Sequence, residues 1–233
     1  MLEKPLALYL PKQQKGLKPQ LQMSIYLSTA YLAPIEYYSK LLSDDVIIEQ
    51  HENYIKQTYR NRCTILSANG PMTLSIPIES SGGKKCLIRD LCVAEHGNWR
   101  HLHWNALISA YNSTPFFEYY QDDFRPFYEK SYKYLFDFNE ELRDLICRLI
   151  DIDTSYLKYT DEFTLELGSE DFRSKISPKT DWRNVDPYFE SVPYYQIFDQ
   201  RFGFSENLSI VDLLFNMGNE SLIVLNKSIK KTS

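Results

Sequence analysis

The stretch that decides the fold runs from residue 23 to residue 49 and reads MSIYLSTAYLAPIEYYSKLLSDDVIIE. Its two ends, Met23–Leu27 and Asp45–Glu49, are short runs rich in apolar side chains, which is typical of buried strands. Pro34–Leu42 lies between them, begins with a proline and carries apolar residues at helical spacing. A strand, a helix and a second strand in this order predict two neighbouring parallel strands.

The next segment predicts a hairpin. Cys63–Ile78 contains Asn69 followed by Gly70 between two apolar runs, and an Asn-Gly pair favours a tight turn between antiparallel strands. Leu87–Cys92 is a further short apolar run, for which we expect another strand.

The pattern becomes helical from about Asn98. Residues 98–111 and Phe138–Ile150 place apolar residues on one face at helical spacing, whereas residues 155–200 hold turn clusters and predict irregular loops with one or two strands. The chain therefore reads as α/β or α+β, with a mixed sheet from the N-terminal half and helices mainly in the C-terminal half.

The length and composition predict a single large domain. Residues 1–22 are rich in Lys, Gln and Pro and read as an N-terminal arm, 23–225 as one domain, and 226–233 as a polar tail. The N-terminal apolar stretch is too short for a secretory signal and no run approaches a membrane span, so we expect a cytoplasmic protein. The four cysteines lack paired spacing and read as reduced thiols.

The charge and the glycine content exclude several classes. A net charge of -5 argues against a nucleic-acid surface, which needs a basic stripe. Only eight glycines are present, and neither a GxGxxG nor a GxxxxGK[ST] string occurs, which argues against a dinucleotide fold and a P-loop. No cofactor is identified from the sequence, and neither is the oligomeric state.

An anion site is predicted around residues 50–62, between two strands. Arg60 and Arg62 flank Asn61, and a guanidinium group matches the geometry of a carboxylate or phosphate. Period-two alternation along a strand would place both arginines on one face, so we expect Lys56, Arg60 and Arg62 to supply at least two cations to one concave surface. The alternative is a solvated strand face.

Ser28, Thr29 and Tyr31 follow the first strand and precede the first helix. Ligands bind at this position in open α/β sheets, although simple helix capping explains the same residues. Each of these side chains carries a hydroxyl group that could bind a polar ligand.

His103 is the candidate acid-base residue. Cys92, His96, His101 and His103 suggest a metal site, but on one helix His101 and His103 point about 200° apart, so we predict no metal. His103 is suited to acid-base work or to ligand hydrogen bonding, and the alternative is a satisfied structural histidine.

Several of these segments together resemble the WbqC-like protein family. The resemblance covers roughly residues 24–220 and is carried by five segments. Three of them are short runs, namely residues 28–38 (STAYLAPIEYY), 176–179 (ISPK) and 207–216 (NLSIVDLLFN). The other two extend from His51-Glu52-Asn53-Tyr54 to Arg60-Asn61-Arg62, and from Leu102-His103-Trp104 through Tyr111 to Pro115-Phe116-Phe117. In the family pattern the positions of Lys56, Arg60, Asn61, Arg62, His103 and Tyr111 are characteristic.

The resemblance implies a function in surface-polysaccharide (O-antigen type) biosynthesis. It suggests a transferase that moves an acyl or aminoacyl group to an amino sugar or sugar nucleotide. In that reaction His103 would act as the base, while Lys56, Arg60, Asn61, Arg62, Tyr31 and Tyr111 would bind an anionic small molecule such as a phosphate or a sugar nucleotide.

Two other functions compete with this one. A non-catalytic sugar-nucleotide binding or assembly protein of the same pathway gains weight because no motif identifies a paired nucleophile and base. A metal-dependent hydrolase would require an ion at Cys92, His96 or His103.

Overall fold

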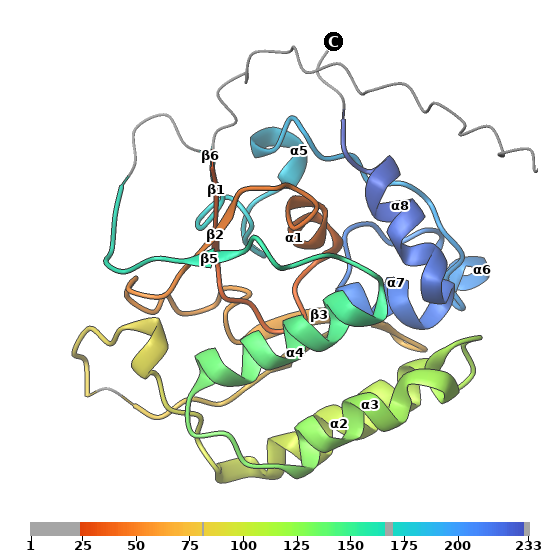
Figure 1. The fold of residues 1–233 in the computed structure, drawn as a ribbon. Helices are drawn as coiled ribbons and strands as arrows, with labels where there is room; N and C mark the ends of the chain where they lie inside the picture. Colours follow the sequence, from red (N-terminus) through yellow and green to blue (C-terminus); the bar gives the residue numbers. More distant parts are fainter. Residues whose placement is uncertain (1–23, 81, 166–169, 231–233) are drawn as a thin grey trace, which may run out of the picture.

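The computed structural model describes residues 24–80, 82–165 and 170–230. The predicted arm at residues 1–22 and the last three residues of the predicted polar tail lie outside this part of the chain. Figure 1 shows the described elements, coloured along the sequence.

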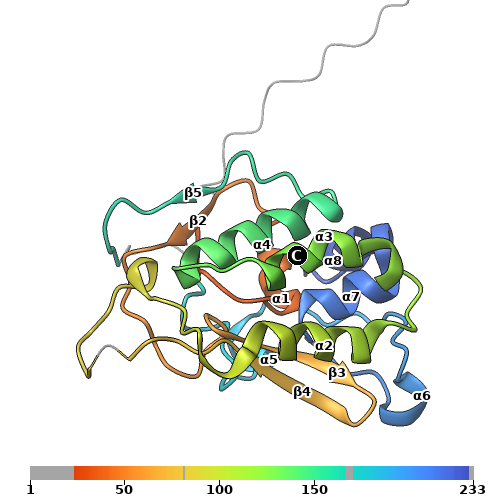
Figure 2. The same cartoon turned by 90° about the horizontal axis from the view of Figure 1, so that it is seen from below.

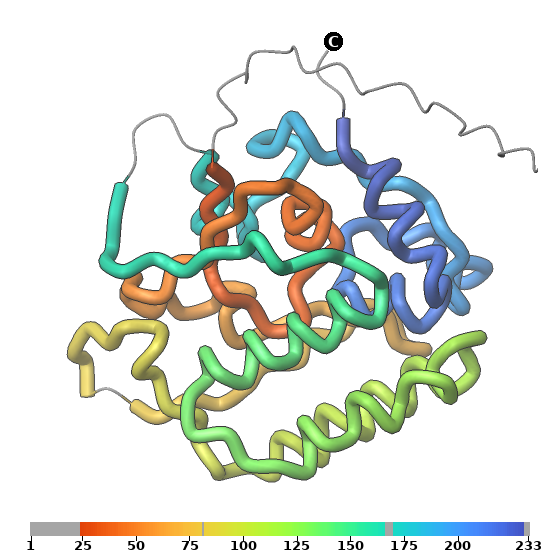
Figure 3. The backbone as a smooth tube through the Cα atoms, in the orientation of Figure 1, coloured from red at the N-terminus to blue at the C-terminus, as the bar shows by residue number. Residues whose placement is uncertain are grey.

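The predicted parallel pair lies at the centre of the fold. β1 (Ile25–Ser28) and β2 (Val46–Glu49) are parallel, with Ile25 opposite Val46 and Ser28 opposite Glu49. The connecting helix α1 (Ile35–Lys40) buries all six of its residues. The strand–helix–strand prediction is therefore confirmed, and Figure 3 shows this red-to-orange segment enclosed by later parts of the chain.

Two further strands complete the parallel sheet, and both come from the C-terminal half. β5 (Lys158–Tyr159) pairs with β2, and β6 (Glu170–Asp171) pairs with the start of β1. The strand order is β5-β2-β1-β6, and all neighbours run in the same direction.

The predicted hairpin forms a separate sheet. β3 (Arg62–Ser67) and β4 (Gly70–Ser75) are antiparallel, and Ser67 pairs with Gly70. The two loop residues are Ala68 and Asn69. Gly70 follows at φ 104°, a left-handed conformation that glycine adopts without a steric penalty. Figure 2 shows the hairpin beside α2.

The helices follow mainly after residue 98, as the sequence predicts. The longer ones are α2 (Trp99–Tyr111), α3 (Phe117–Glu129), α4 (Leu135–Leu149), α7 (Ile210–Met217) and α8 (Ser221–Lys227). Two single-turn helices, α5 (Trp182–Val185) and α6 (Asp199–Phe202), and three 3-10 turns, Ile88–Asp90, His96–Asn98 and Gly218–Glu220, complete the set. The fold class is α/β, with parallel and antiparallel strands and helices mainly C-terminal.

One element differs from its prediction. Residues 88–90 form a 3-10 turn, and the flanking chain makes only isolated bridges, from Asn53 to Leu87 and from Cys92 to Tyr134. The strand expected at Leu87–Cys92 is therefore wrong, because only Ile88 and Leu91 are buried, the turn packs against α4, and the run makes no ladder of its own.

Candidate functional site

The carboxyl ends of the four parallel strands lie at one edge of the sheet. The connection that follows β1 leads to β2, which lies on one side of β1. β6 lies on the other side of β1, so the direction of the connections changes between the neighbouring strands β1 and β6. In open α/β sheets, ligands bind at this divergence, outside the carboxyl ends of the strands. The side chains at the ends of β1 and β6 therefore border the expected ligand position.

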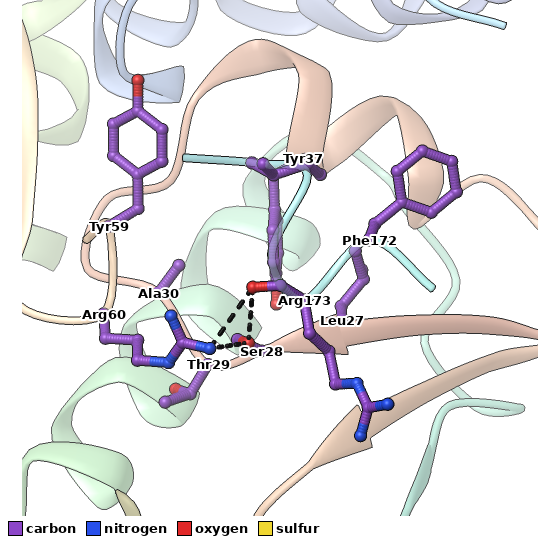
Figure 4. A pocket seen from close by; sticks show the side chains of 10 residues that line it. Leu27, Ser28, Thr29, Ala30, Tyr37, Tyr59, Arg60, Phe172 and Arg173 are labelled. Carbon is purple, nitrogen blue, oxygen red and sulfur yellow. Dashed lines mark hydrogen bonds between the residues drawn. The ribbon is translucent and has the colours of Figure 1, made fainter. Parts of the chain in front are cut away.

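Arg60 is the centre of a buried hydrogen-bond network at this edge. Its Nε donates to Oε1 of Glu52 at 2.7 Å, and its Nη2 donates to Oε2 of the same carboxylate at 2.5 Å. Nη2 also donates to the Ser28 hydroxyl at 2.7 Å and to the Arg173 carbonyl at 3.3 Å (Figure 4). Arg60 therefore links the end of β2 to the residues after β1 and β6.

Two more arginines at this edge are also paired. Arg173 donates to Oε2 of Glu49 at 2.9 Å and binds Asp171 through Nε and Nη2. On the neighbouring helix α4, Arg143 is paired with Glu140, whose other oxygen accepts from the Thr29 hydroxyl at 2.7 Å. All three guanidinium groups are buried, and each is neutralised by a carboxylate.

These ion pairs bear on the prediction that Arg60 binds an anion. The Nε–Nη2 edge of Arg60 is occupied by Glu52, by the Ser28 hydroxyl and by the Arg173 carbonyl, so this edge cannot hold a ligand as well. The cavity that Ser28, Thr29, Arg60 and Arg173 line is only about 10 Å³, room for about one water molecule (Figure 4). The expectation that Arg60 presents its charge on an open concave surface is therefore wrong.

A larger polar pocket continues from this cavity, and we name it the crevice pocket. Its volume is about 270 Å³, and Tyr59 lines both spaces. Its walls are formed by Glu36, Tyr59, Ser177, Pro178, Thr180, Trp182, Arg183, Glu206 and Asn207. These residues come from α1, from the loop before β3, from the segment after β6 and from the segment before α7, so the pocket lies on the side where β1 and β6 diverge.

Glu36 is the buried ionisable group of the crevice pocket. It lies in the first turn of α1, is 2% exposed, and accepts from Nδ2 of Asn207 at 3.0 Å. The amide oxygen of Asn207 in turn accepts from the backbone N–H of Glu36 at 2.9 Å. This reciprocal pair fixes the carboxyl group in the pocket wall.

A second carboxyl group lies beside Glu36. Asp186 is buried and forms an ion pair of 2.5 Å with Lys40, one turn after Glu36 on α1. The pKa of Glu36 is raised to about 7, mainly by burial and also by the neighbouring Asp186, against the opposing effects of Asn207 and Lys40. A carboxyl group with this pKa both gives and takes a proton near neutral pH.

The outer wall of the pocket combines an aromatic ring with a cation. Arg183 lies 4.6 Å from the ring centroid of Trp182 and is ion-paired with Glu206 and Asp181. A half-exposed indole beside charged groups offers a flat apolar face with polar partners at its rim, which suits a polar ring-shaped ligand.

The other predicted anion residues lie elsewhere. Lys56 is exposed and lines a different pocket. Arg62 is half-buried at the start of β3, and its Nε has no hydrogen-bond partner. Asn61 is buried and donates to the Ile76 carbonyl at 2.8 Å, so it connects β3 to the chain after β4.

His103 and Tyr31 do come together, but inside the core. The Tyr31 hydroxyl lies 2.9 Å from Nδ1 of His103 and 3.0 Å from the hydroxyl of Tyr128. His103 is 5% exposed, and burial lowers its pKa to about 4, against a small opposing effect of the Ser75 backbone. His103 therefore does not lie at the arginine edge of the sheet, because its ring packs on the rings of Tyr31 and Trp99.

Tyr111 lies on the same helix and is fully buried. Its hydroxyl donates to Oδ1 of Asp212 at 3.0 Å and accepts from the backbone of Leu66. The predicted contact of Tyr111 with a substrate has no open surface to occur on, because the side chain is fully enclosed. Asp212 is engaged here and makes no side-chain cap with Ser209, whose hydroxyl donates to the Leu32 carbonyl.

Within residues 24–80, 82–165 and 170–230, no three His, Cys, Asp or Glu side chains approach closely enough to hold a metal ion.

One feature of the sequence points to Glu36. It is the only charged residue in the run from Ile25 to Ser39, which is otherwise apolar or hydroxyl-bearing. An acidic residue in a segment that is buried on all sides needs a partner. In the sequence alone Glu36 has the position of an ordinary first-turn acid, and its partners Asp186 and Asn207 lie at least 150 residues further on.

The fold and the site define an α/β protein with a polar pocket at the divergence of its parallel strands. The model of the WbqC-like protein family matches residues 29–185, about two thirds of the chain. The chain belongs to this family. It is also similar to the uncharacterized protein Rv1507c of Mycobacterium tuberculosis (strain ATCC 25618 / H37Rv), with 26% identity over 205 residues, covering 76% of this chain and 86% of the relative.

No solved structure matches the chain significantly. In the described part of the chain, no helix is long and apolar enough to cross a membrane.

The five segments that carry the family resemblance have a spatial relation that the sequence does not show. Four of them contribute to the crevice pocket: Glu36, Tyr59, Ser177 and Asn207 each come from a different segment. The fifth forms most of α2 and reaches the start of α3, and its His103 packs on Tyr31 and Trp99.

Proposed function

We propose that this protein is a transferase of bacterial surface-polysaccharide biosynthesis that acts at the crevice pocket, moving an acyl or aminoacyl group to an amino sugar or sugar nucleotide. The observation that carries the proposal is the Glu36 carboxyl group, held in the wall of a polar pocket at the strand divergence with a pKa of about 7. Family membership supports the pathway.

The chemistry assigns Glu36 the role of proton acceptor. In acyl transfer, the sugar nitrogen forms a bond to the carbonyl carbon, and the bond from that carbon to its leaving group breaks. The nitrogen loses a proton, which the Glu36 carboxylate takes up. Asn207 orients that carboxylate, and the adjacent Asp186 keeps its affinity for the proton high. Glu36 replaces His103 in this role because Glu36 lines the crevice pocket, whereas the ring of His103 packs on Tyr31 and Trp99.

The pocket walls also suit a sugar. The Trp182 ring supplies a face for the apolar side of a pyranose, and Glu206, Asn207 and the hydroxyls of Ser177 and Thr180 supply polar partners. The volume of about 270 Å³ is close to the lower end of small-molecule sites.

The test begins with ligand binding. The purified protein is heated with UDP- and dTDP-linked amino sugars, and its melting temperature is compared with that measured with the unaminated sugar nucleotides. We expect stabilisation by amino sugars, because a ligand that binds only the folded state raises its stability. Stabilising sugars are then incubated with activated acyl and aminoacyl donors, and the N-acylated product is measured. Absence of stabilisation by every amino sugar would contradict the proposal.

One observation favours a second candidate, a non-catalytic binding protein of the same pathway. The three buried arginines at the sheet edge are all neutralised internally, which makes the edge a rigid frame. If an amino sugar binds and no donor yields product, this second function holds. A Trp182→Ala variant should weaken binding under either function, whereas Glu36→Gln should abolish only transfer.

A further inference from the structure

A second pocket lies apart from the crevice pocket, and we name it the lysine pocket. Its volume is about 410 Å³. It lies between the loop after β2 and the segment that follows β4, and it is lined by Asn53, Tyr54, Lys56, Ile78, Glu79, Ser80, Gly83, Lys84, Lys85, Cys86 and Leu91.

Backbone contacts hold the two walls of the lysine pocket together. The N–H of Tyr54 donates to the Cys86 carbonyl at 2.9 Å, and Asn53 makes an isolated bridge with Leu87. The N–H of Ile88 donates to the carbonyl of Glu52, the partner of Arg60. The lysine pocket is therefore built on the same buried frame as the edge of the parallel sheet.

The rim of this pocket is cationic. Lys56, Lys84 and Lys85 lie around a single acidic residue, Glu79. Among the described residues, Lys56 and Lys85 take part in no ion pair. Three lysines around one concavity stand out in a chain whose net charge is -5. Such a concavity attracts anions, since its charges add in the space between them.

A further cation lies behind the pocket wall. The charges of Arg62 and Arg60 both act on the Tyr54 hydroxyl. Glu52 neutralises Arg60, but Arg62 has no ion pair within the part of the chain that the structure describes, and its buried Nε has no hydrogen-bond partner. A buried donor without an acceptor is costly, and an anion nearby would reduce that cost.

The floor of the pocket is apolar and aromatic. The half-buried ring of Tyr54 and the side chains of Ile78 and Leu91 line it. An inorganic anion would use only the rim, whereas this combination matches a ligand with a flat, weakly polar ring at one end and two or more negative charges at the other. The volume falls within the range of small-molecule sites.

We propose that the lysine pocket binds a nucleoside diphosphate, with its base against Tyr54, Ile78 and Leu91 and its diphosphate at Lys56, Lys84 and Lys85. The proposal does not depend on transfer at Glu36, because it concerns binding alone. It retains Lys56 from the predicted anion residues and adds Lys84 and Lys85, which the sequence did not single out.

The test is calorimetric titration with UDP. The wild-type protein is compared with a Lys56→Gln/Lys85→Gln double variant, and with Lys227→Gln, an exposed lysine on α8 that is outside the pocket lining, as the control. We expect the double variant to bind UDP at least tenfold more weakly and the control to bind as the wild type does. The affinity of the wild type should also fall with rising salt, since exposed charges are screened.

Titrations with inorganic pyrophosphate and with uridine separate the two halves of the ligand. Both should bind more weakly than UDP. Pyrophosphate binding as tight as that of UDP would overturn the role of the apolar floor, and UDP binding unchanged in the double variant would overturn the lysine site. The Glu36→Gln variant should bind UDP normally, so failure of transfer and failure of this proposal give different results.

Discussion

Two buried carboxyl groups, Glu36 and Asp212, have the same local position and different surroundings. Each lies in the first turn of a helix, where the dipole favours a negative charge, and burial raises the pKa of each, to about 7 for Glu36 and about 6 for Asp212. Neither sequence position alone distinguishes a structural carboxylate from one suited to chemistry.

Their hydrogen-bond partners make the difference. Asp212 accepts from the hydroxyls of Tyr111 and Tyr194 and from the Gln196 amide, at 3.0, 2.6 and 2.9 Å. Glu36 accepts from Asn207 and has a second carboxyl group beside it. Three donors stabilise a charge, whereas a neighbouring carboxyl group favours holding a proton. Burial therefore marks a candidate site only together with the kind of partner.

The largest expected effect tests the structural side of this comparison. Asp212→Ala leaves two tyrosine hydroxyls and an amide without their common acceptor, so the free energy of unfolding should fall by about 4 kcal/mol. Urea denaturation measures it. Asp123→Ala, at an exposed position on α3, is the control and should change stability by less than about 0.5 kcal/mol. If Asp212→Ala and Asp123→Ala had the same free energy of unfolding, Asp212 would not be a structural carboxylate, and its contrast with Glu36 would be lost.

The next effect tests the chemical side. Glu36→Gln keeps the size of the side chain and a polar group opposite Asn207, but it cannot take up a proton. The transfer rate should fall at least about 100-fold, about 2.7 kcal/mol in activation free energy, with the fold retained. Glu118→Gln, the exposed first-turn acid of α3, should retain the wild-type rate. If the Glu36→Gln protein kept full activity, Glu36 would be a structural carboxylate, as Asp212 is.

His103 allows a third test, because its buried contacts are those of a structural residue, as are the contacts of Asp212. Removing its ring contacts in His103→Gln should lower the free energy of unfolding by about 2 kcal/mol, since the Tyr31 hydroxyl loses a partner in a packed aromatic core. His101→Gln, two residues earlier and exposed, is the matched control. Unchanged stability combined with lost transfer activity would restore His103 as the catalytic base.

The smallest effect, taken for each pH unit, is the pH dependence of stability. The pKa of Glu36 is raised in the folded state, from an ordinary value of 4.5 to about 7, so the folded protein holds the proton more tightly than the unfolded chain does. Its contribution is fully present below pH 4.5 and is lost as the pH rises to about 7, by about 1 kcal/mol for each pH unit. The difference in stability between wild type and Glu36→Gln, measured from pH 4.5 to 8, should show this slope. A flat difference would mean that Glu36 is already ionised at pH 4.5.

Much of the fold was predictable from local patterns. The β1–α1–β2 unit, the β3–β4 hairpin and helices α2 and α4 all have a strong apolar period or a turn signal. β5 and β6 are two residues each, too short to carry a pattern, and only their pairing with β2 and β1 makes them strands. The division of the strands into two sheets likewise depends on long-range packing.

The candidate site was predictable only in its general place. Ser28 and Thr29 do lie at the sheet edge where the sequence places a ligand site. The predicted cations do not lie together in the structure. Arg60 is paired with Glu52, eight residues earlier in the chain, whereas Lys56 is exposed to solvent. A sequence shows which residues carry charge, and the choice of partner depends on contacts between distant segments.

The pairing of β6 with β1 also has a consequence for the order of folding. Ile25 and Glu170 are neighbours in the sheet, although 145 residues separate them in the chain. Closing so long a loop is slow, because its entropic cost precedes the contacts that repay it. The β3–β4 hairpin and the α3–α4 pair need only short loops, so we expect them to form early. The crevice pocket, whose walls include the segment after β6, would then be among the last parts of the molecule to assemble.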